Sequence, residues 1–271
     1  MFRTFTRVAA LAAVLVGAVG AAHASAARQA TAAATDASVT AAVAARAGVT
    51  SRPPCQVGPR GEVPGGSAPG QVGARSVIAF PQFRWPQGQI PYVIDWSLSN
   101  ATNLIGRAFQ EYHQKTCLRF VQKTAQHRNY IKIFAGQGCY SNVGMVNQGE
   151  QPVSLGQGCL PYGTIVHELG HAVGLFHEHN RSDRDDHLII YWQNIQQGMA
   201  DQFTKVDPSH NLLINTFDLN SIMLYGSTLY SKDGRSPVMV HRGGQQLREV
   251  YDKPGLSRAD VERINVAYGC R

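Results

Sequence analysis

The stretch HELGHAVGLFHEH, from His167 to His179, holds four of the ten histidines in this chain of 271 residues. Residues four apart lie on one face of a helix, with about 5–6 Å between their Cβ atoms. His167 and His171 can therefore reach one small cation together. Gly174 can adopt a positive φ that ends the helix and turns the chain back, so that His177 approaches the same cation from the other side. The spacing predicts a metal site with three imidazole ligands.

Three protein ligands leave a tetrahedral metal one open position for water, which is typical of catalytic zinc, whereas structural zinc has four protein ligands. Imidazoles favour zinc over calcium or magnesium, although cobalt or copper fits the same geometry. Glu168 follows His167, so its carboxylate can stand beside the ion and act as a base for zinc-activated water. His179 lies two residues past the third ligand, and we do not expect it to bind. We expect one catalytic zinc ion.

The first 24 residues have the pattern of a secretory signal peptide. Arg3 and Arg7 precede an apolar run over 8–22, and Ala22-His23-Ala24 supplies a cleavage site. The run is too short to span a bilayer comfortably, although an uncleaved anchor is the alternative. We expect a secreted protein without stable membrane association.

Residues 25–75 form a leader, rich first in alanine and then in glycine and proline, which lacks the apolar side chains for a core of its own. Residues 1–75 hold seven arginines and two acidic residues, so they carry +5 of the net charge of +7. The remaining domain, 76–271, carries only +2. This charge gives no case for nucleic-acid binding. We read 1–24 as a signal peptide, 25–75 as a propeptide and 76–271 as the folded domain.

The cysteines divide between the leader and the domain. Four of the five lie after residue 75 in an exported chain, which predicts two disulfides, and three pairings are open: Cys117, Cys139, Cys159 and Cys270. The fifth, Cys55, lies alone in the leader.

The rest of the domain predicts an α+β fold with a mixed sheet. Strand patterns occur before the histidine motif, at 90–95, 118–121, 130–134, 143–146 and 153–155. Helical patterns occur at 99–116, 160–174, 192–203 and 257–268. Ser99 or Asn100 can cap the first helix, and Ser257 with Asp260 is placed as a capping box for the last.

The pattern H-E-x-x-H-x-x-G-x-x-H fixes the residue type at five positions, and a random window matches it about once in three million. Histidines that lie on a helix surface by chance are therefore a weak alternative. The stretch resembles the signature of the metzincin metalloproteases. Within them it is similar to the astacin family, because Glu178 follows the third histidine and Arg181 and the DRD segment 183–185 come next. The resemblance runs from Trp85 to Cys270. It implies a zincin-like, two-lobed catalytic domain with a mixed twisted sheet and the active-site helix in the N-terminal lobe, and a more irregular C-terminal lobe that ends in a helix.

The same resemblance implies roles for further residues. Met223, in SIMLYG, matches the Met-turn residue that forms an apolar floor under the metal, and Tyr225 matches the tyrosine that stabilises the transition state. Without the motif around it, Tyr225 reads as a core tyrosine. The substrate edge strand corresponds to Tyr140, Ser141 and Asn142, although an interior or merely solvated strand is the alternative. The implied disulfides are Cys117–Cys270 and Cys139–Cys159.

Latency is expected to depend on the leader. Astacin leaders usually block the zinc with an aspartate in an F-x-G-D motif, which this leader lacks. Its RPPCQVG segment loosely resembles the Pro-Arg-Cys-Gly switch of matrix metalloproteases, so we hypothesise that Cys55 occupies the open zinc position. A free thiol or an intermolecular disulfide is the alternative. A cut after Arg75 would release the enzyme, and by family analogy the new amino terminus would turn inward toward Glu178.

We therefore expect a monomeric, secreted zinc endopeptidase that acts on protein or peptide substrates and is inhibited by its own propeptide. A catalytically silent, zinc-stabilised binding protein is the rival from another class, but such a protein has no need of Glu168. A different metzincin branch is disfavoured by Glu178 and by the cysteine spacing.

Overall fold

A six-stranded mixed sheet combines one strand of the leader with five strands from the first half of the domain. Its strands are β1 (Cys55–Val57), β3 (Gln89–Ile94), β4 (Arg119–Gln122), β5 (Tyr130–Phe134), β6 (Cys139–Ser141) and β7 (Glu150–Leu155). The order is β1-β6-β7-β5-β3-β4, and all neighbours pair in parallel except β6 and β7. The computed structural model describes residues 55–57, 76–207, 209 and 211–271; the predicted signal peptide and the rest of the leader lie outside them.

Strand β5 shows why these segments pair. Ile131 and Ile133 are fully buried, whereas Lys132 between them is half-buried and its Nζ lies 3.5 Å from Asp95 Oδ2. Alternation with a period of two places the isoleucines on the face that packs against the helices. The predicted strand at 130–134 is confirmed, and those predicted at 90–95 and 118–121 correspond to β3 and β4 with shifts of one residue.

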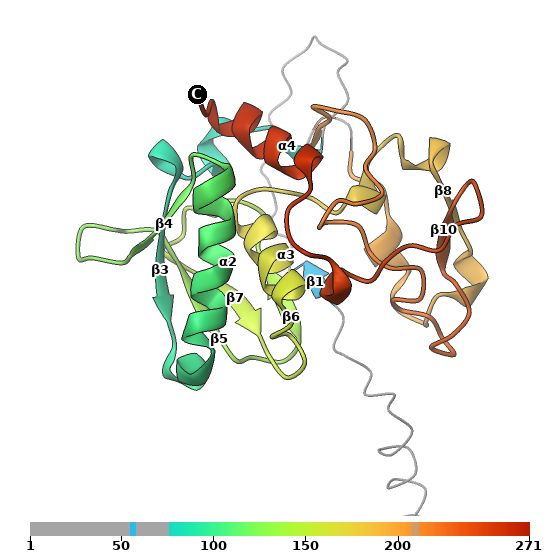
Figure 1. Cartoon of the computed structure of the whole chain (residues 1–271), viewed down its shortest axis with the longest axis horizontal. Helices are drawn as coiled ribbons and strands as arrows, with labels where there is room; N and C mark the ends of the chain where they lie inside the picture. The colour runs from blue at the N-terminus through green and yellow to red at the C-terminus, as the bar shows by residue number, and fades with distance from the viewer. Residues whose placement is uncertain (1–54, 58–75, 208, 210) are drawn as a thin grey trace, which may run out of the picture. The chain divides into compact units, whose positions relative to one another are not determined.

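Helices α2 (Thr102–Lys115) and α3 (Tyr162–Ala172) lie side by side against the sheet (Figure 1). The Tyr112 hydroxyl of α2 donates to the Val166 carbonyl of α3 at 2.6 Å, so a buried hydrogen bond fixes the two helices together. The predicted cap of α2 is wrong. A 3-10 turn precedes the helix, Asp95 caps that turn by accepting from the Ser97 N–H at 3.0 Å, and the residue before α2 makes no side-chain cap.

Irregular chain follows α3, interrupted by two small antiparallel sheets. β8 (Leu188–Ile190) pairs with β10 (Met239–His241), and β2 (Val77–Ile78) pairs with β9 (Asn211–Leu212). The predicted helix at 192–203 is wrong, because the segment forms two 3-10 turns separated by Gly198 at a φ of +83°. The predicted strand at 143–146 is also wrong. Gly144 has a φ of +72° and donates its N–H to the His171 carbonyl, which holds this segment as a bend against α3.

The last helix, α4 (Arg258–Tyr268), begins with the predicted capping box. Ser257 Oγ accepts from the Asp260 N–H and Asp260 Oδ2 accepts from the Ser257 N–H, each at 3.0 Å. This box satisfies two of the backbone donors that a helix start leaves without intrahelical partners. The α+β class with a mixed sheet is confirmed.

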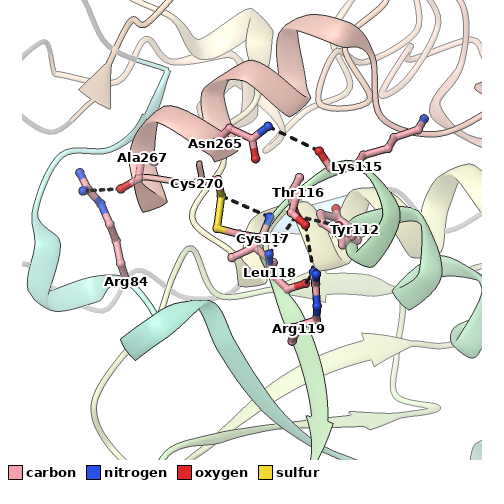
Figure 2. Close-up of a disulfide and its surroundings, with 10 residues drawn as sticks. All are labelled: Arg84, Tyr112, Lys115, Thr116, Cys117, Leu118, Arg119, Asn265, Ala267 and Cys270. Carbon is pink, nitrogen blue, oxygen red and sulfur yellow. Dashed lines mark hydrogen bonds between the residues drawn. A yellow bond between two sulfur atoms is a disulfide. The ribbon is translucent and has the colours of Figure 1, made fainter.

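Two disulfides fix the ends of these elements. Cys117–Cys270 joins the start of β4 to the chain just past α4, where Arg84 also donates to the Ala267 carbonyl at 2.7 Å (Figure 2). Cys139–Cys159 joins β6 to the loop before α3. This is the pairing that the family resemblance implied. Among the described residues, no helix has both the length and the apolar character needed to cross a membrane.

Candidate metal centre

Helix α3 carries two of the predicted ligands and ends so that the third can approach. His167 and His171 are both fully buried on α3. After the helix, Gly174 has a φ of +102°, and a Cβ added there would lie 2.7 Å from the Ile78 side chain. Only glycine fits both the backbone conformation and the space. The chain therefore reverses at Gly174, and His177 returns toward the helix.

The three imidazoles converge through their Nε2 atoms. The Nε2 of His177 lies 3.2 Å from that of His167 and 3.0 Å from that of His171. Among the residues that the structure describes, these three histidines form the cluster suited to a metal ion, with their ligand atoms within 4.8 Å of one another. His179 is not part of it: its ring stacks on His177 with centroids 4.9 Å apart, and its Nε2 lies 3.2 Å from the Gln202 carbonyl.

Each ring is oriented by an acceptor at its other nitrogen. The contacts at Nδ1 are His167 to the Ile222 carbonyl (2.8 Å), His171 to the Leu175 carbonyl (2.9 Å) and His177 to Asn180 Oδ1 (3.1 Å). A carbonyl oxygen can only accept, so we assign the imidazole proton to Nδ1 in all three rings. The Nε2 lone pairs are then free to bind a metal, which is the usual arrangement around metal-ligating histidines.

Distances and charge states both fit zinc. A tetrahedral ion with Zn–N bonds of about 2.0–2.1 Å has its nitrogen ligands about 3.3–3.4 Å apart, close to the spacing of the Nε2 atoms. Burial lowers the pKa of His171 to about 4 and those of His167 and His177 well below the usual range. The rings are therefore neutral at pH 7, the form that coordinates metal.

The two predicted catalytic side chains lie with this cluster. Glu168 follows His167 on α3 and is fully buried. Tyr225 is also fully buried, and its ring centroid lies 4.3 Å from that of His177 and 6.2 Å from that of His167. The site therefore combines three neutral imidazoles with a buried carboxyl group and a buried phenol.

A sequence model of the family Astacin (peptidase family M12A) matches residues 77–269. The chain belongs to the astacin family. It is 43% identical over 188 residues to zinc metalloproteinase nas-15 of Caenorhabditis elegans, covering 69% of this chain and 32% of nas-15. It is 40% identical over 199 residues to astacin-like metalloprotease toxin 1 of Loxosceles intermedia, covering 72% of this chain and 75% of the toxin.

Among solved structures, high choriolytic enzyme 1, a hatching enzyme zinc-protease of the medaka fish Oryzias latipes, is similar with a TM-score of 0.63 and 36% identity. The match covers 69% of this chain and 94% of that enzyme, and it confirms the metzincin-like α+β catalytic domain. The chain spans less than half the length of several curated relatives. Astacin-family peptidases use one catalytic zinc, and the three-histidine cluster fits that ion.

The segment predicted to form the Met-turn lies against α3. Leu224 donates its N–H to the Ser221 carbonyl at 3.1 Å, which closes a turn around Met223. A Cβ added at Gly170, between the two helical ligands, would lie 2.7 Å from Met223 Sδ. The thioether therefore packs against the helix between His167 and His171, and its role as an apolar floor under the metal stays a prediction.

Glu178, the predicted partner of the astacin mature amino terminus, already lies in a buried ion cluster. Arg263 donates to both of its carboxylate oxygens, at 2.7 and 2.8 Å, and Arg181 contacts it at 3.3 Å. Ser76, where the mature chain is expected to begin, is buried and donates its backbone N–H to the Leu212 carbonyl. In the uncut chain arginines therefore supply the positive charge at Glu178, and its pairing with a new amino terminus stays a prediction.

The predicted substrate edge corresponds to β6, which contains Tyr140 and Ser141 and ends just before Asn142. The outer side of β6 is paired in parallel with leader strand β1, in a register that aligns Cys55 with Cys139 and Val57 with Ser141. β1 also contacts α3, the helix that carries two ligands. The side chain of Cys55 is outside the part of the chain that the structure describes, so its coordination of zinc stays a prediction.

Several supporting residues were not predicted from the sequence. Asn180 orients His177, Arg263 neutralises Glu178, and Lys253 lies buried against the Met-turn. Only Asn180 had a local signal, because it follows the third ligand by three residues. The other two reach the site from the chain around α4, more than seventy residues later.

Proposed function

We propose that residues 76–271 form a zinc endopeptidase that hydrolyses internal peptide bonds of proteins or peptides. The observation that carries this proposal is the convergence of three Nε2 atoms, with that of His177 3.2 Å from His167 and 3.0 Å from His171, together with the buried Glu168 next to His167 on α3 and the Tyr225 ring against His177. A silent zinc site has no use for a base and a phenol at the same place, whereas peptide hydrolysis uses both.

Each residue has a distinct task in this mechanism. Bound zinc supplies Lewis-acid chemistry, which acidifies water and polarises the scissile carbonyl. Glu168 accepts the proton of the attacking water and passes it to the leaving amine. The Tyr225 hydroxyl donates a hydrogen bond to the developing oxyanion, a contact of a kind that is typically worth about 2.7–4 kcal/mol. Ile222, Leu175 and Asn180 hold the imidazoles in place throughout.

Substrate recognition is proposed to use β6. An extended peptide can add to an exposed strand through main-chain hydrogen bonds, which bind peptides of many sequences. Tyr140 and Ser141 belong to that strand and Asn142 follows it. We propose that these three residues bind the substrate backbone in the mature enzyme.

The leader is proposed to keep the enzyme latent during export. Signal peptide 1–24 would direct secretion, and two disulfides agree with an oxidising compartment. Propeptide 25–75 would inhibit in two ways: β1 takes the side of β6 that a substrate would use, and Cys55 would bind the zinc. Cleavage after Arg75 would remove both.

The test is proteolysis of casein by the full chain before and after limited trypsin treatment, with and without a zinc chelator. We expect activity only after cleavage, loss with chelator and recovery with added zinc. Glu168→Gln should keep zinc and lose nearly all turnover, whereas exposed Glu150→Gln should leave turnover unchanged. Near-normal activity of the Glu168→Gln variant would refute the role of Glu168 as the catalytic base.

Cys55 is tested separately by the Cys55→Ala precursor. If the thiolate binds zinc, this variant gains activity without cleavage, and a zinc–sulfur distance of about 2.3 Å disappears from its X-ray absorption spectrum. An uncut Cys55→Ala chain that stays fully latent would show that β1 or another part of the leader suffices.

A further inference from the structure

A buried lysine contacts the Met-turn from outside the zinc ligands. Lys253 is only 4% exposed, and its Nζ donates to the carbonyls of Ser221 at 2.7 Å and Leu224 at 2.5 Å. These are the first and last residues of the turn that carries Met223. An ammonium group is seldom buried unless its donors are satisfied, so this placement is a specific one.

The same turn is held from the other side by α4. Asp260 is fully buried, and its Oδ1 accepts from the Ser221 hydroxyl at 2.6 Å. Its Oδ2 accepts from the Ile222 N–H at 2.8 Å. The peptide group between Ser221 and Ile222 is therefore bound at both ends, its oxygen by Lys253 and its nitrogen by Asp260.

Fixing these peptide groups fixes the metal centre. The Ile222 carbonyl accepts from Nδ1 of His167, so the orientation of that ligand depends on the turn. The Leu224 carbonyl and the Tyr225 nitrogen belong to one planar peptide group, so a bond to this oxygen restricts where the Tyr225 backbone can lie. Lys253 thus acts on a ligand and on a catalytic side chain through the backbone of the turn.

We propose that Lys253 is a positioning residue of the metal centre: its ammonium clamps the turn from Ser221 to Leu224, and the clamped turn sets the orientation of His167 and the position of Tyr225. The part concerning Tyr225 rests on the proposed peptidase function, whereas the part concerning His167 needs only metal binding.

The ammonium form is present at neutral pH. Burial lowers the pKa of Lys253 to about 8, and the carboxylates around it oppose that shift: Asp260, Glu249, Asp218 and Glu178. Charge strengthens hydrogen bonds to carbonyls roughly twofold over neutral donors. At pH 7 the clamp therefore works with a charged donor.

The experiment compares Lys253→Met, which removes the donors at similar length, with Lys253→Arg, which restores them. Lys232→Met is the matched control, because Lys232 also donates to a backbone carbonyl, that of Gln193 at 2.9 Å, but is exposed. Zinc affinity is measured by competition with a chromophoric chelator. We expect the zinc Kd of Lys253→Met to rise about 10-fold or more, as for loss of other groups that orient a ligand. The arginine variant and the control should stay within about threefold of wild type by the same measure.

A double-mutant cycle with Tyr225→Phe supplies the second readout, at saturating zinc. Lys253→Met should lower kcat about 10²-fold with KM nearly unchanged, the size of losing one oxyanion donor. In the Tyr225→Phe background the same substitution should have little further effect. Additive effects on kcat, together with an unchanged zinc Kd, would overturn the proposal.

A failure of the proposed peptidase function would give a different result from a failure of the Lys253 proposal. The wild-type chain would then show no proteolysis, while the zinc Kd of Lys253→Met would still decide the part concerning His167. If the methionine variant does not fold, Lys253→Gln is measured instead, because it keeps an amide donor that is too short to reach both carbonyls. The same direction of change is expected.

Discussion

Replacing Asn180 by alanine tests how far the third zinc ligand depends on its support. The Asn180 side chain makes three hydrogen bonds: its Oδ1 accepts from His177 Nδ1 at 3.1 Å, and its Nδ2 donates to the carbonyls of Gln202 at 2.9 Å and Thr204 at 2.8 Å. The residue is 8% exposed, so water has little access to replace these bonds. Alanine removes the acceptor for the imidazole and leaves two carbonyls without this donor.

The expected effect has two parts. Loss of the group that orients a ligating histidine typically weakens metal binding about 10–100-fold. Gln202 is half-buried and its carbonyl keeps the contact with His179 Nε2, and Thr204 is exposed, so losing the two donated bonds should cost about 1–3 kcal/mol of folding stability in total. Since natural domains are stable by only about 5–15 kcal/mol, the variant should fold but unfold at clearly lower denaturant concentration.

The assay separates the two parts. Zinc Kd is measured by chelator competition, and unfolding of the zinc-free protein is followed in urea with the disulfides intact. Asn194→Ala is the matched control, because the half-buried Asn194 also donates to a backbone carbonyl, that of Pro237 at 2.8 Å. If Asn180→Ala and Asn194→Ala bind zinc equally well, the support of His177 by Asn180 is refuted.

Three further predictions concern stability. Gly163→Ala in α3 should lose about 3 kcal/mol or more of folding stability, because the new Cβ would overlap the Val250 carbonyl. Gly106→Ala in α2 should gain up to about 1 kcal/mol, because its Cβ meets nothing within 4 Å. Urea unfolding of both variants measures whether the two changes in stability have opposite signs. The pKa of Lys253 is about 8 in the folded protein and about 10.5 in the unfolded chain, so between these pH values the unfolded state binds one more proton and the wild-type stability rises with pH by up to about 3 kcal/mol. The Lys253→Met variant should lack this rise. Equal slopes of unfolding free energy against pH for the two proteins would contradict the prediction. Removing the Cys117–Cys270 disulfide, which spans 153 residues, should cost about 5 kcal/mol of folding stability, whereas removing Cys139–Cys159, which spans 20 residues, should cost about 3 kcal/mol. If the variant without Cys139–Cys159 unfolds at the lower urea concentration, chain entropy is excluded as the main cause.

The zinc ligands could be predicted because their geometry is almost local. His167 and His171 are placed by the repeat of one helix, and His177 is placed by the turn at Gly174, three residues after His171. The groups that orient these ligands are different in kind. The carbonyl that holds His167 comes from Ile222, 55 residues away, and any residue type can supply a carbonyl. No side-chain pattern marks it, so the sequence contained no signal for it.

The two wrongly predicted elements also have local causes. The segment 192–203 has apolar residues at helical intervals, but Gly198 takes a positive φ and divides it into two short turns. The segment 143–146 has valines and a methionine that suit a strand. It is instead a bend bound to the end of α3, because Gly144 takes a φ of +72° and donates its N–H to the His171 carbonyl at 2.9 Å. In both places a tertiary contact or a glycine conformation overrides the residue pattern.

The capping box of α4 joins a rule readable in the sequence to a contact that is not. Ser257 and Asp260 were predicted to cap the helix, and they do. The same Asp260 carboxylate also binds the Ser221 hydroxyl and the Ile222 N–H of the Met-turn. The start of α4 is therefore fixed to the metal centre, whereas its end is fixed to β4 by the Cys117–Cys270 disulfide. Loss of the disulfide releases the end that does not touch the turn, so its effect should be on stability. Loss of the Asp260 carboxylate releases the end that does, so zinc affinity should fall as well.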